Sequence, residues 1–97
     1  MKPLSEDLDD PHAQPYFIWD VPITVRELKD ILAGEDDATT ALWTARVMRE
    51  ARYPDVWRFL TLDQVVRRHS RAERHLGRRR RFWKFLLEGW RADGLLP

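Results

Sequence analysis

A helix-start signal that occurs twice restricts the folds open to this chain more than any other feature. Thr24 is followed by Glu27, and Thr61 is followed by Gln64. Each pair forms a capping box, in which each side chain accepts a hydrogen bond from the backbone N–H of the other residue. Apolar residues then follow the first box at the spacing of one helical face, at Leu28, Ile31 and Leu32. The chain is therefore predicted to be built from helices.

Four to five helices are predicted in all. The first ends near Ala33, and the second spans 38–52 after a cap at Asp36 or Asp37. A short helix over 54–60 has proline in its first turn, the second capping box opens a helix to about His69, and the last helix spans 78–93. Residues 70–77 are predicted to be a polar connection, while Gly94 ends the last helix and lets Leu95 and Leu96 fold back onto it.

The connections are short and no run of alternating strands is present. These features indicate an all-α fold, a compact bundle of four to five helices with an irregular acidic N-terminal arm. Residues 1–15 contain three prolines and four acidic residues and are predicted to be a flexible arm, with a single helical domain over 16–97. A length of 97 residues fits one domain, and a hydrophobic fraction of 43% is enough for a core.

Basic and acidic residues are distributed unevenly along the chain. Residues 1–40 contain ten acidic and three basic side chains, whereas residues 41–97 contain fourteen basic and six acidic ones. Such a separation predicts electrostatic contact, either between the two halves or with a partner. The start of the chain lacks the apolar run of a signal peptide, and no stretch approaches the roughly 20 apolar residues of a membrane span. The protein is therefore expected to be cytoplasmic, with no membrane partner.

A dense basic cluster lies between residues 67 and 84. Glu73 is its one acidic residue, and its nine basic members are Arg67, Arg68, Arg71, Arg74, Arg78, Arg79, Arg80, Arg81 and Lys84. Arginine forms planar bidentate contacts with carboxylates and with phosphates, which gives weight to a recognition role. The cluster would suit a nucleic-acid-binding module, either helix-turn-helix-like or RNA-binding. An acidic protein surface, the chain's own acidic arm and plain solvation are the alternatives.

Aromatic residues form the second unusual pattern. In the last predicted helix they widen the apolar arc beyond that of an ordinary surface helix, so the helix is either central in the bundle or has one strip facing a partner. The short run Tyr16-Phe17-Ile18-Trp19 is interpreted as a segment packed on the helices, with docking into another protein as the alternative. Interfaces are enriched in such rings. The candidate partner-binding residues are Phe82, Trp83, Phe85, Trp90, Tyr16, Phe17 and Trp19.

Catalysis finds little support in the residues. The chain has no cysteine, its three histidines show no metal-binding spacing, and its four glycines are isolated, so no phosphate-binding loop is predicted. Neither serine has an evident base beside it. We therefore expect a protein that is not an enzyme, with no catalytic residues, no cofactor and no metal.

Several motifs resemble one group of proteins. They are Phe17-Ile18-Trp19-Asp20, Leu42-Trp43, Ala45-Arg46, Arg49-Glu50-Ala51-Arg52-Tyr53, Asp55-Val56-Trp57-Arg58-Phe59-Leu60-Thr61 and Arg81-Phe82-Trp83-Lys84-Phe85-Leu86-Leu87-Glu88-Gly89-Trp90. Over about residues 16–96 the chain resembles small bacterial proteins encoded beside nucleotidyltransferases of the AbiEii toxin type. The resemblance implies an antitoxin-like role, in which the protein binds and neutralises a nucleotidyltransferase-type toxin. It does not extend to a winged-helix DNA-binding domain of the kind known for AbiE antitoxins.

The leading hypothesis from the sequence is thus an antitoxin-like protein of a bacterial toxin–antitoxin pair, with a protein as its partner. The aromatic strips of the last helix and the basic cluster would make the contacts. The acidic arm, with Glu6, Asp7, Asp9 and Asp10, would occlude the phosphate-binding site of the toxin. Nucleic acid bound through the Arg67–Lys84 cluster is the second hypothesis, and self-association through Phe82–Trp90 is the third.

Overall fold

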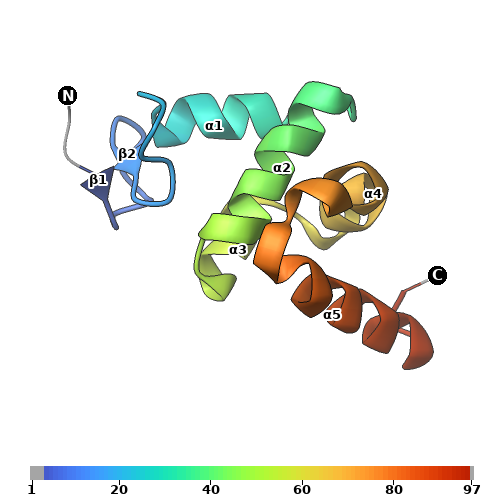
Figure 1. Cartoon of the computed structure of the whole chain (residues 1–97). Coiled ribbons are helices and arrows are strands. Elements are labelled where there is room, and N and C mark those ends of the chain that lie inside the picture. Colours follow the sequence, from blue (N-terminus) through green and yellow to red (C-terminus); the bar gives the residue numbers. More distant parts are fainter. Residues whose placement is uncertain (1–3, 97) are drawn as a thin grey trace.

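Five α-helices dominate the computed structural model, which describes residues 4–96 (Figure 1). The helices are α1 (Val25–Leu32), α2 (Ala38–Glu50), α3 (Tyr53–Phe59), α4 (Leu62–Ala72) and α5 (Arg80–Ala92). Two 3₁₀ turns, η1 (Glu73–His75) and η2 (Gly77–Arg79), connect α4 to α5. The short strands β1 (Leu4–Ser5) and β2 (Gln14–Pro15) pair in parallel near the start of the chain. The predicted all-α bundle is confirmed.

Side-chain caps begin α1 and α4 where the sequence predicts them. Thr24 Oγ1 accepts a hydrogen bond from the Glu27 N–H at 3.2 Å, and Glu27 Oε1 accepts one from the Thr24 N–H at 3.1 Å. Thr61 and Gln64 form the second box in the same way, at 3.1 and 3.0 Å. Each box satisfies backbone N–H groups that the first turn of a helix would otherwise leave unpaired.

The start of α2 resolves an ambiguity between two neighbouring aspartates. Asp37 is the cap, and its carboxylate accepts a hydrogen bond from the Thr40 N–H at 2.9 Å. Thr40 Oγ1 accepts one in return from the Asp37 N–H, also at 2.9 Å. Asp36 is therefore left outside the cap, with its carboxylate available for contacts with α4.

The boundaries around the last connection differ from those predicted. α4 runs on to Ala72, beyond the predicted end at His69, and α5 begins at Arg80, two residues later than predicted. The two 3₁₀ turns account for the difference. Gly77 is the first residue of the second turn, and its φ of +53° is a left-handed conformation that glycine adopts without the strain of a Cβ atom.

α2 is the central helix, and it contacts α1, α3, α4 and both 3₁₀ turns. Its Val47 and Met48 are fully buried. Trp83 of α5 is also fully buried, and its indole Nε1–H donates a hydrogen bond to the Met48 carbonyl at 2.9 Å. This bond joins α5 to the middle of the bundle and pairs a polar atom that burial would otherwise leave unsatisfied.

Residues 4–15 lie against the helices, where a flexible acidic arm is predicted from the sequence. Leu8 is only 2% exposed and belongs to the hydrophobic core. Gln14 is also buried, and its Nε2 donates to the carbonyl oxygens of Ile18 and Val21 at 2.9 and 3.1 Å. The division at residues 15 and 16 therefore does not separate a free arm from the domain, since a single leucine among the acids anchors this segment. Residues 1–3 lie outside the described residues.

The uneven charge of the chain is partly neutralised within it. Acidic residues of the first forty form ion pairs with arginines of the second part at Glu6–Arg52, Asp9–Arg58, Asp20–Arg46, Asp36–Arg67 and Asp36–Arg68. Two of these pairs involve the segment that was expected to reach a partner. Glu6 and Asp9 instead form ion pairs with Arg52 and Arg58 of the same chain.

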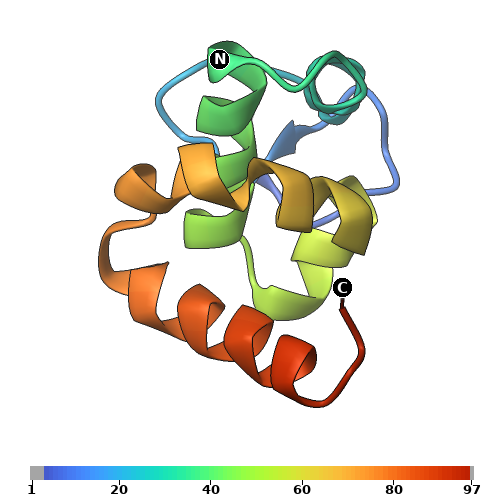
Figure 2. The same cartoon turned by 90° about the vertical axis from the view of Figure 1, so that its right-hand side faces the viewer.

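The end of α5 follows the predicted Schellman arrangement. Gly94 has a φ of +76°, the Leu95 N–H donates to the Trp90 carbonyl at 2.8 Å, and the Gly94 N–H donates to the Arg91 carbonyl at 3.1 Å. The chain then turns back toward the rest of the bundle (Figure 2). Leu96 packs against the core, whereas Leu95 is 68% exposed. No helix within residues 4–96 has the length and apolar character needed to cross a membrane.

Candidate binding surfaces

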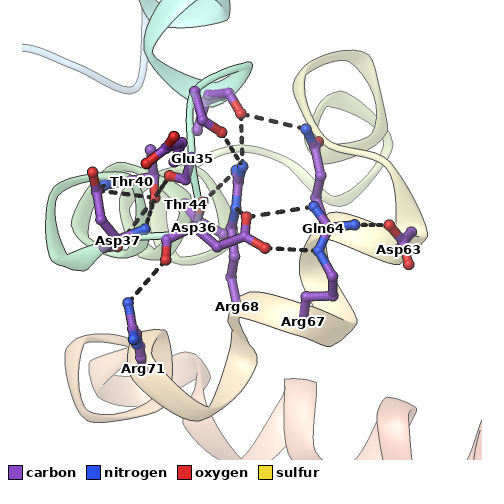
Figure 3. A network of polar contacts seen from close by, with 12 residues as sticks. Glu35, Asp36, Asp37, Thr40, Thr44, Asp63, Gln64, Arg67, Arg68 and Arg71 are labelled. Atoms are coloured by element: carbon purple, nitrogen blue, oxygen red, sulfur yellow. Dashed lines mark hydrogen bonds and ion pairs between the residues drawn. The ribbon is translucent and has the colours of Figure 1, made fainter.

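A buried arginine organises the first half of the basic cluster (Figure 3). Arg68 is 2% exposed, and its guanidinium donates hydrogen bonds to four acceptors. The acceptors are Asp36 Oδ1 at 2.7 Å, Leu32 O at 2.9 Å, Gly34 O at 3.2 Å and Thr44 Oγ1 at 3.3 Å. Two of them are carbonyls at the C-terminal end of α1, which have no partner within the helix. Arg68 therefore caps α1 and fastens it to α2 and α4.

Asp36 is the anion of this network. Its carboxylate accepts from Arg67 Nε and from Arg68 Nε, each at 2.7 Å, and its backbone carbonyl accepts from Arg71 at 2.9 Å. Hydrogen bonds from Arg67 and then Arg68 lower the pKa of Asp36 to about 2. Arg67 also pairs with Asp63 one turn earlier on α4. These contacts give Arg67, Arg68 and Arg71 partners within the chain.

The second half of the cluster, around the start of α5, is arranged differently. Arg80 pairs with Glu73 at 3.1 Å, and Lys84 lies 4.0 Å from Glu88 on the next turn. Among residues 4–96, the remaining arginines of this half form no ion pair or hydrogen bond through their side chains. They are Arg78, Arg79 and Arg81.

The first turn of α5 also lacks the features that stabilise a helix start. Arg79 is the N-cap residue, it makes no side-chain capping bond, and the turn contains no acidic residue. The helix dipole disfavours cations at this end, by about 0.3–1 kcal/mol for each exposed charge. A run of arginines here is locally unfavourable, a pattern that natural proteins keep mainly at functional sites.

The basic cluster is thus two regions, not one continuous patch. Arg68 is buried, and Arg67 and Arg71 bond to Asp36. The predicted single electropositive surface over residues 67–84 is corrected to that extent, because Asp36, in the loop between α1 and α2, pairs with Arg67 and Arg68, whereas Arg71 bonds only to its backbone carbonyl. Seven residues, 73–79, separate α4 from α5, which is longer than the 3–4-residue turn of a helix-turn-helix.

The rings of α5 also divide into buried and exposed members. Trp83 is fully buried and Trp90 is half-buried, whereas Phe82 is 38% exposed and Phe85 is 74% exposed. Phe85 follows Phe82 by three residues and Gly89 follows Phe85 by four, so all three lie on one helical strip. A Cβ atom at Gly89 would meet nothing within 4 Å. Trp83 is therefore a core residue, and the strip of Phe82, Phe85 and Gly89 is open.

Aromatic contacts extend this strip onto α3. Tyr53 lies edge-on to Phe82 with the ring centroids 5.8 Å apart, and Trp57 lies 6.3 Å from Trp90. A shallow hollow of about 270 Å³ is lined by Tyr53, Trp57, Leu62 and Trp90. We call the surface formed by Tyr53, Trp57, Leu62, Phe82, Phe85 and Trp90 the aromatic face. Tyr53, Trp57 and Leu62 were not among the partner-binding residues predicted from the sequence, although the spacing of Tyr53 and Trp57 puts their side chains on one side of α3.

The predicted partner-binding segment at the start of the domain is mostly internal. Phe17 is 2% exposed and Ile18 is fully buried. The Tyr16 hydroxyl donates to Asp55 Oδ2 at 2.7 Å and accepts from the Arg52 N–H at 2.8 Å, and burial raises the pKa of this hydroxyl. Tyr16 and Phe17 therefore hold the segment to the helices and are not free for a partner.

Trp19 is the exception in this segment. It is 53% exposed, and one face of its ring is covered by the Arg46 guanidinium, 4.4 Å from the ring centroid. Arg46 is fixed in turn by the Phe17 carbonyl, which accepts from its Nε at 3.3 Å, and by Asp20. Trp19 remains accessible to another molecule, at a site separate from the aromatic face.

The fold and these surfaces define a small all-α protein with exposed aromatic and arginine side chains. Within residues 4–96 no group of three or more histidine, aspartate or glutamate side chains is placed to hold a metal ion. No protein-family model matches the chain, and comparison with curated proteins and with solved structures gives no significant match.

Proposed function

We propose that this protein acts by binding another protein through the aromatic face, as an antitoxin-like component that neutralises a nucleotidyltransferase-type toxin. The observation that carries the proposal is Phe85, which is 74% exposed beside Phe82 and the open position at Gly89. Aromatic residues, Phe among them, are enriched in the cores of protein interfaces, and a few buried anchor residues carry most of the binding energy. The identity of the partner rests on the resemblance over residues 16–96.

The charges beside the aromatic face specify the chemistry of the partner surface. Arg78, Arg79 and Arg81 have no ion-pair partner among the described residues and flank the uncapped start of α5. An apolar patch bordered by aspartates or glutamates would cover the rings and neutralise these cations at once. Such complementarity accelerates association and excludes partners of the wrong charge.

Co-expression with the nucleotidyltransferase-type product of the adjacent gene tests this function. We expect the two proteins to elute together, and Phe85→Asp to weaken the complex roughly thirtyfold or more, the ~2 kcal/mol of an interface hot spot. Leu4→Asp is the matched control, because Leu4 is 45% exposed and lies in β1, at the other end of the molecule from α5 (Figure 1). Separate elution at micromolar concentration would refute the proposal.

Nucleic acid is a second candidate partner, favoured by the same unpaired arginines. Phosphates would satisfy both the guanidinium groups and the N–H groups of the first turn of α5. The affinity would then fall steeply with salt, with a log–log slope of about −0.9 for each phosphate neutralised on duplex DNA. Arg78→Ala combined with Arg81→Ala should abolish this binding, and Phe85→Asp should leave the salt slope unchanged. Negligible affinity for DNA and RNA at low salt excludes this function.

A further inference from the structure

A second surface, along α2, is separate from the aromatic face. Two adjoining hollows of about 320 Å³ each lie side by side there and share Leu42 and His75 as lining residues. Leu42 is 51% exposed although it is a large aliphatic residue on a helix of the bundle. We call the two hollows together the α2 groove. None of its lining residues belongs to the aromatic face.

The charge of the α2 groove is one-sided. Its lining includes Arg46, Arg49, Arg71 and Arg74 and contains no acidic residue. Arg46 and Arg49 are paired outside the lining, with Asp20 and Glu50 respectively. Arg71 and Arg74 form no ion pair with any described residue, so the groove keeps an excess of positive charge.

Arg71 and Arg74, which form no ion pair within residues 4–96, are nevertheless held in position. Arg71 donates to the Asp36 carbonyl at 2.9 Å, and Arg74 Nε donates to His75 Nε2 at 3.2 Å. Neither acceptor is a carboxylate, so these bonds orient the guanidinium groups without forming an ion pair. Cations that are already oriented lose less conformational entropy when an anion binds.

The apolar part of the groove lining is mostly aliphatic. Leu42 is central and is flanked by Ala38 and Ala41 in one hollow and by Val21 and Trp43 in the other. Nucleic-acid bases are held mainly by stacking on exposed rings. Trp43 is half-buried, and the exposed ring of Trp19, which Arg46 covers on one face, does not line the groove. Leu42 is an exposed aliphatic side chain surrounded by arginines. Such a surface fits an aliphatic side chain flanked by carboxylates better than it fits a nucleic-acid base.

We propose that the α2 groove binds an acidic peptide segment of a partner protein, with an apolar side chain of the segment on Leu42 and its carboxylates on Arg71 and Arg74. The chain's own acidic segment does not supply this peptide, because its Glu6 and Asp9 pair with Arg52 and Arg58 elsewhere. The site stands independently of the function proposed for the aromatic face, and the two surfaces can be inactivated separately.

The test uses the full chain and a fluorescein-labelled eight-residue peptide in which leucines are placed between glutamates. Binding is measured by fluorescence anisotropy at low salt. We expect saturable binding that Leu42→Asp weakens at least tenfold and that Arg71→Ala with Arg74→Ala also weakens at least tenfold. Phe85→Asp is the matched control, since it places the same charge on the other surface and should leave the affinity unchanged. Circular dichroism verifies that each variant is folded.

Two control peptides separate the contributions. Replacing every glutamate by glutamine, or every leucine by serine, should each remove most of the affinity. Equal binding of the serine peptide, or an affinity unaffected by Leu42→Asp, would overturn the proposal, because simple charge attraction would then explain the data. Binding of a single-stranded oligonucleotide in preference to the peptide would overturn it as well. If the peptide does not bind the α2 groove, the function proposed for the aromatic face is still tested separately by the effect of Phe85→Asp on the partner complex.

Discussion

The arginines of α4 and those that lead into α5 are close in sequence but differ in what surrounds them. Arg68 is buried with four acceptors, and Arg67 pairs with the Asp36 carboxylate. Arg78, Arg79 and Arg81 have no side-chain partner among the described residues. A dense run of one residue type therefore contains side chains that hold the fold together and side chains that are free to recognise another molecule.

The difference follows from what each helix faces. α4 packs beside the C-terminal end of α1, whose carbonyls and the nearby Asp36 need donors. Among residues 4–96, the arginines at the start of α5 pair with no carboxylate other than that of Glu73, which bonds to Arg80. Burial and available acceptors, and not the density of charge, decide which arginines are structural.

The largest expected effect concerns Arg68. Arg68→Ala should lower the free energy of unfolding by about 3 kcal/mol or more, because it removes a buried charged donor that bonds four acceptors and leaves the space of its side chain empty. Urea denaturation measures this loss. Arg78→Ala is the matched control and should change the stability by less than about 0.5 kcal/mol. Similar losses of unfolding free energy in the two variants would contradict the distinction between the arginines of α4 and those that lead into α5.

The rings of α5 provide the next test. Trp83→Phe should lower the unfolding free energy by about 2 kcal/mol, because the Met48 carbonyl loses its donor and part of the buried ring volume is lost. Phe85→Ala, two residues along, should change the stability by about 0.5 kcal/mol or less. Thermal unfolding followed by circular dichroism compares the two variants. A large loss for Phe85→Ala would mean that its ring supports the fold.

The starts of α4 and α5 allow a third comparison. Thr61→Ala removes the cap of α4 and should lower the unfolding free energy by about 1 kcal/mol. Arg79→Ala removes no capping bond from α5 and should be neutral or slightly stabilising, because a cation leaves the positive end of the helix. Chemical denaturation resolves this difference. Equal destabilisation would show that Arg79 has a structural contact.

The smallest expected effect is a dependence of the unfolding free energy on pH in the acidic range. The pKa of Asp36 is lowered from 3.8 to about 2 in the folded chain, so its contribution to stability is present above about pH 4 and is lost as the pH falls toward 2. In Asp36→Asn the unfolding free energy should fall less steeply over this range than in the unchanged protein. Unfolding measured at pH 4 and at pH 2 gives the two slopes. If the unfolding free energies of the two proteins depended on pH with the same slope, the Asp36 carboxylate would not be the stabilising partner of Arg67 and Arg68.

Local signals in the sequence were sufficient to predict much of the fold. The capping boxes at Thr24 and Thr61 and the glycine at position 94 each act through residues a few positions away, so they are visible in the sequence. The anchoring of residues 4–15 was missed because it depends on Leu8, one apolar residue among acids, reaching a core formed by distant helices.

The candidate surfaces were only partly predictable for the same reason. Arg68 and Arg78 look alike in a charged run, and the carbonyls that select Arg68 come from residues more than thirty positions earlier. The two strips of rings on α5 were recognised without knowing which one faces the core. Arg81 and Glu88 flank Phe85 at helical spacing and would have indicated that Phe85 faces outward.

The open position at Gly89 has a practical consequence. The chain contains no cysteine, so Gly89→Cys would introduce its single thiol. A Cβ atom there meets no neighbour within 4 Å, and the substitution removes a glycine from a helix interior, so the bundle should tolerate it. A photo-crosslinker attached at this point would lie within reach of Phe85 and would covalently capture whatever covers that ring, so mass spectrometry could identify the captured molecule directly.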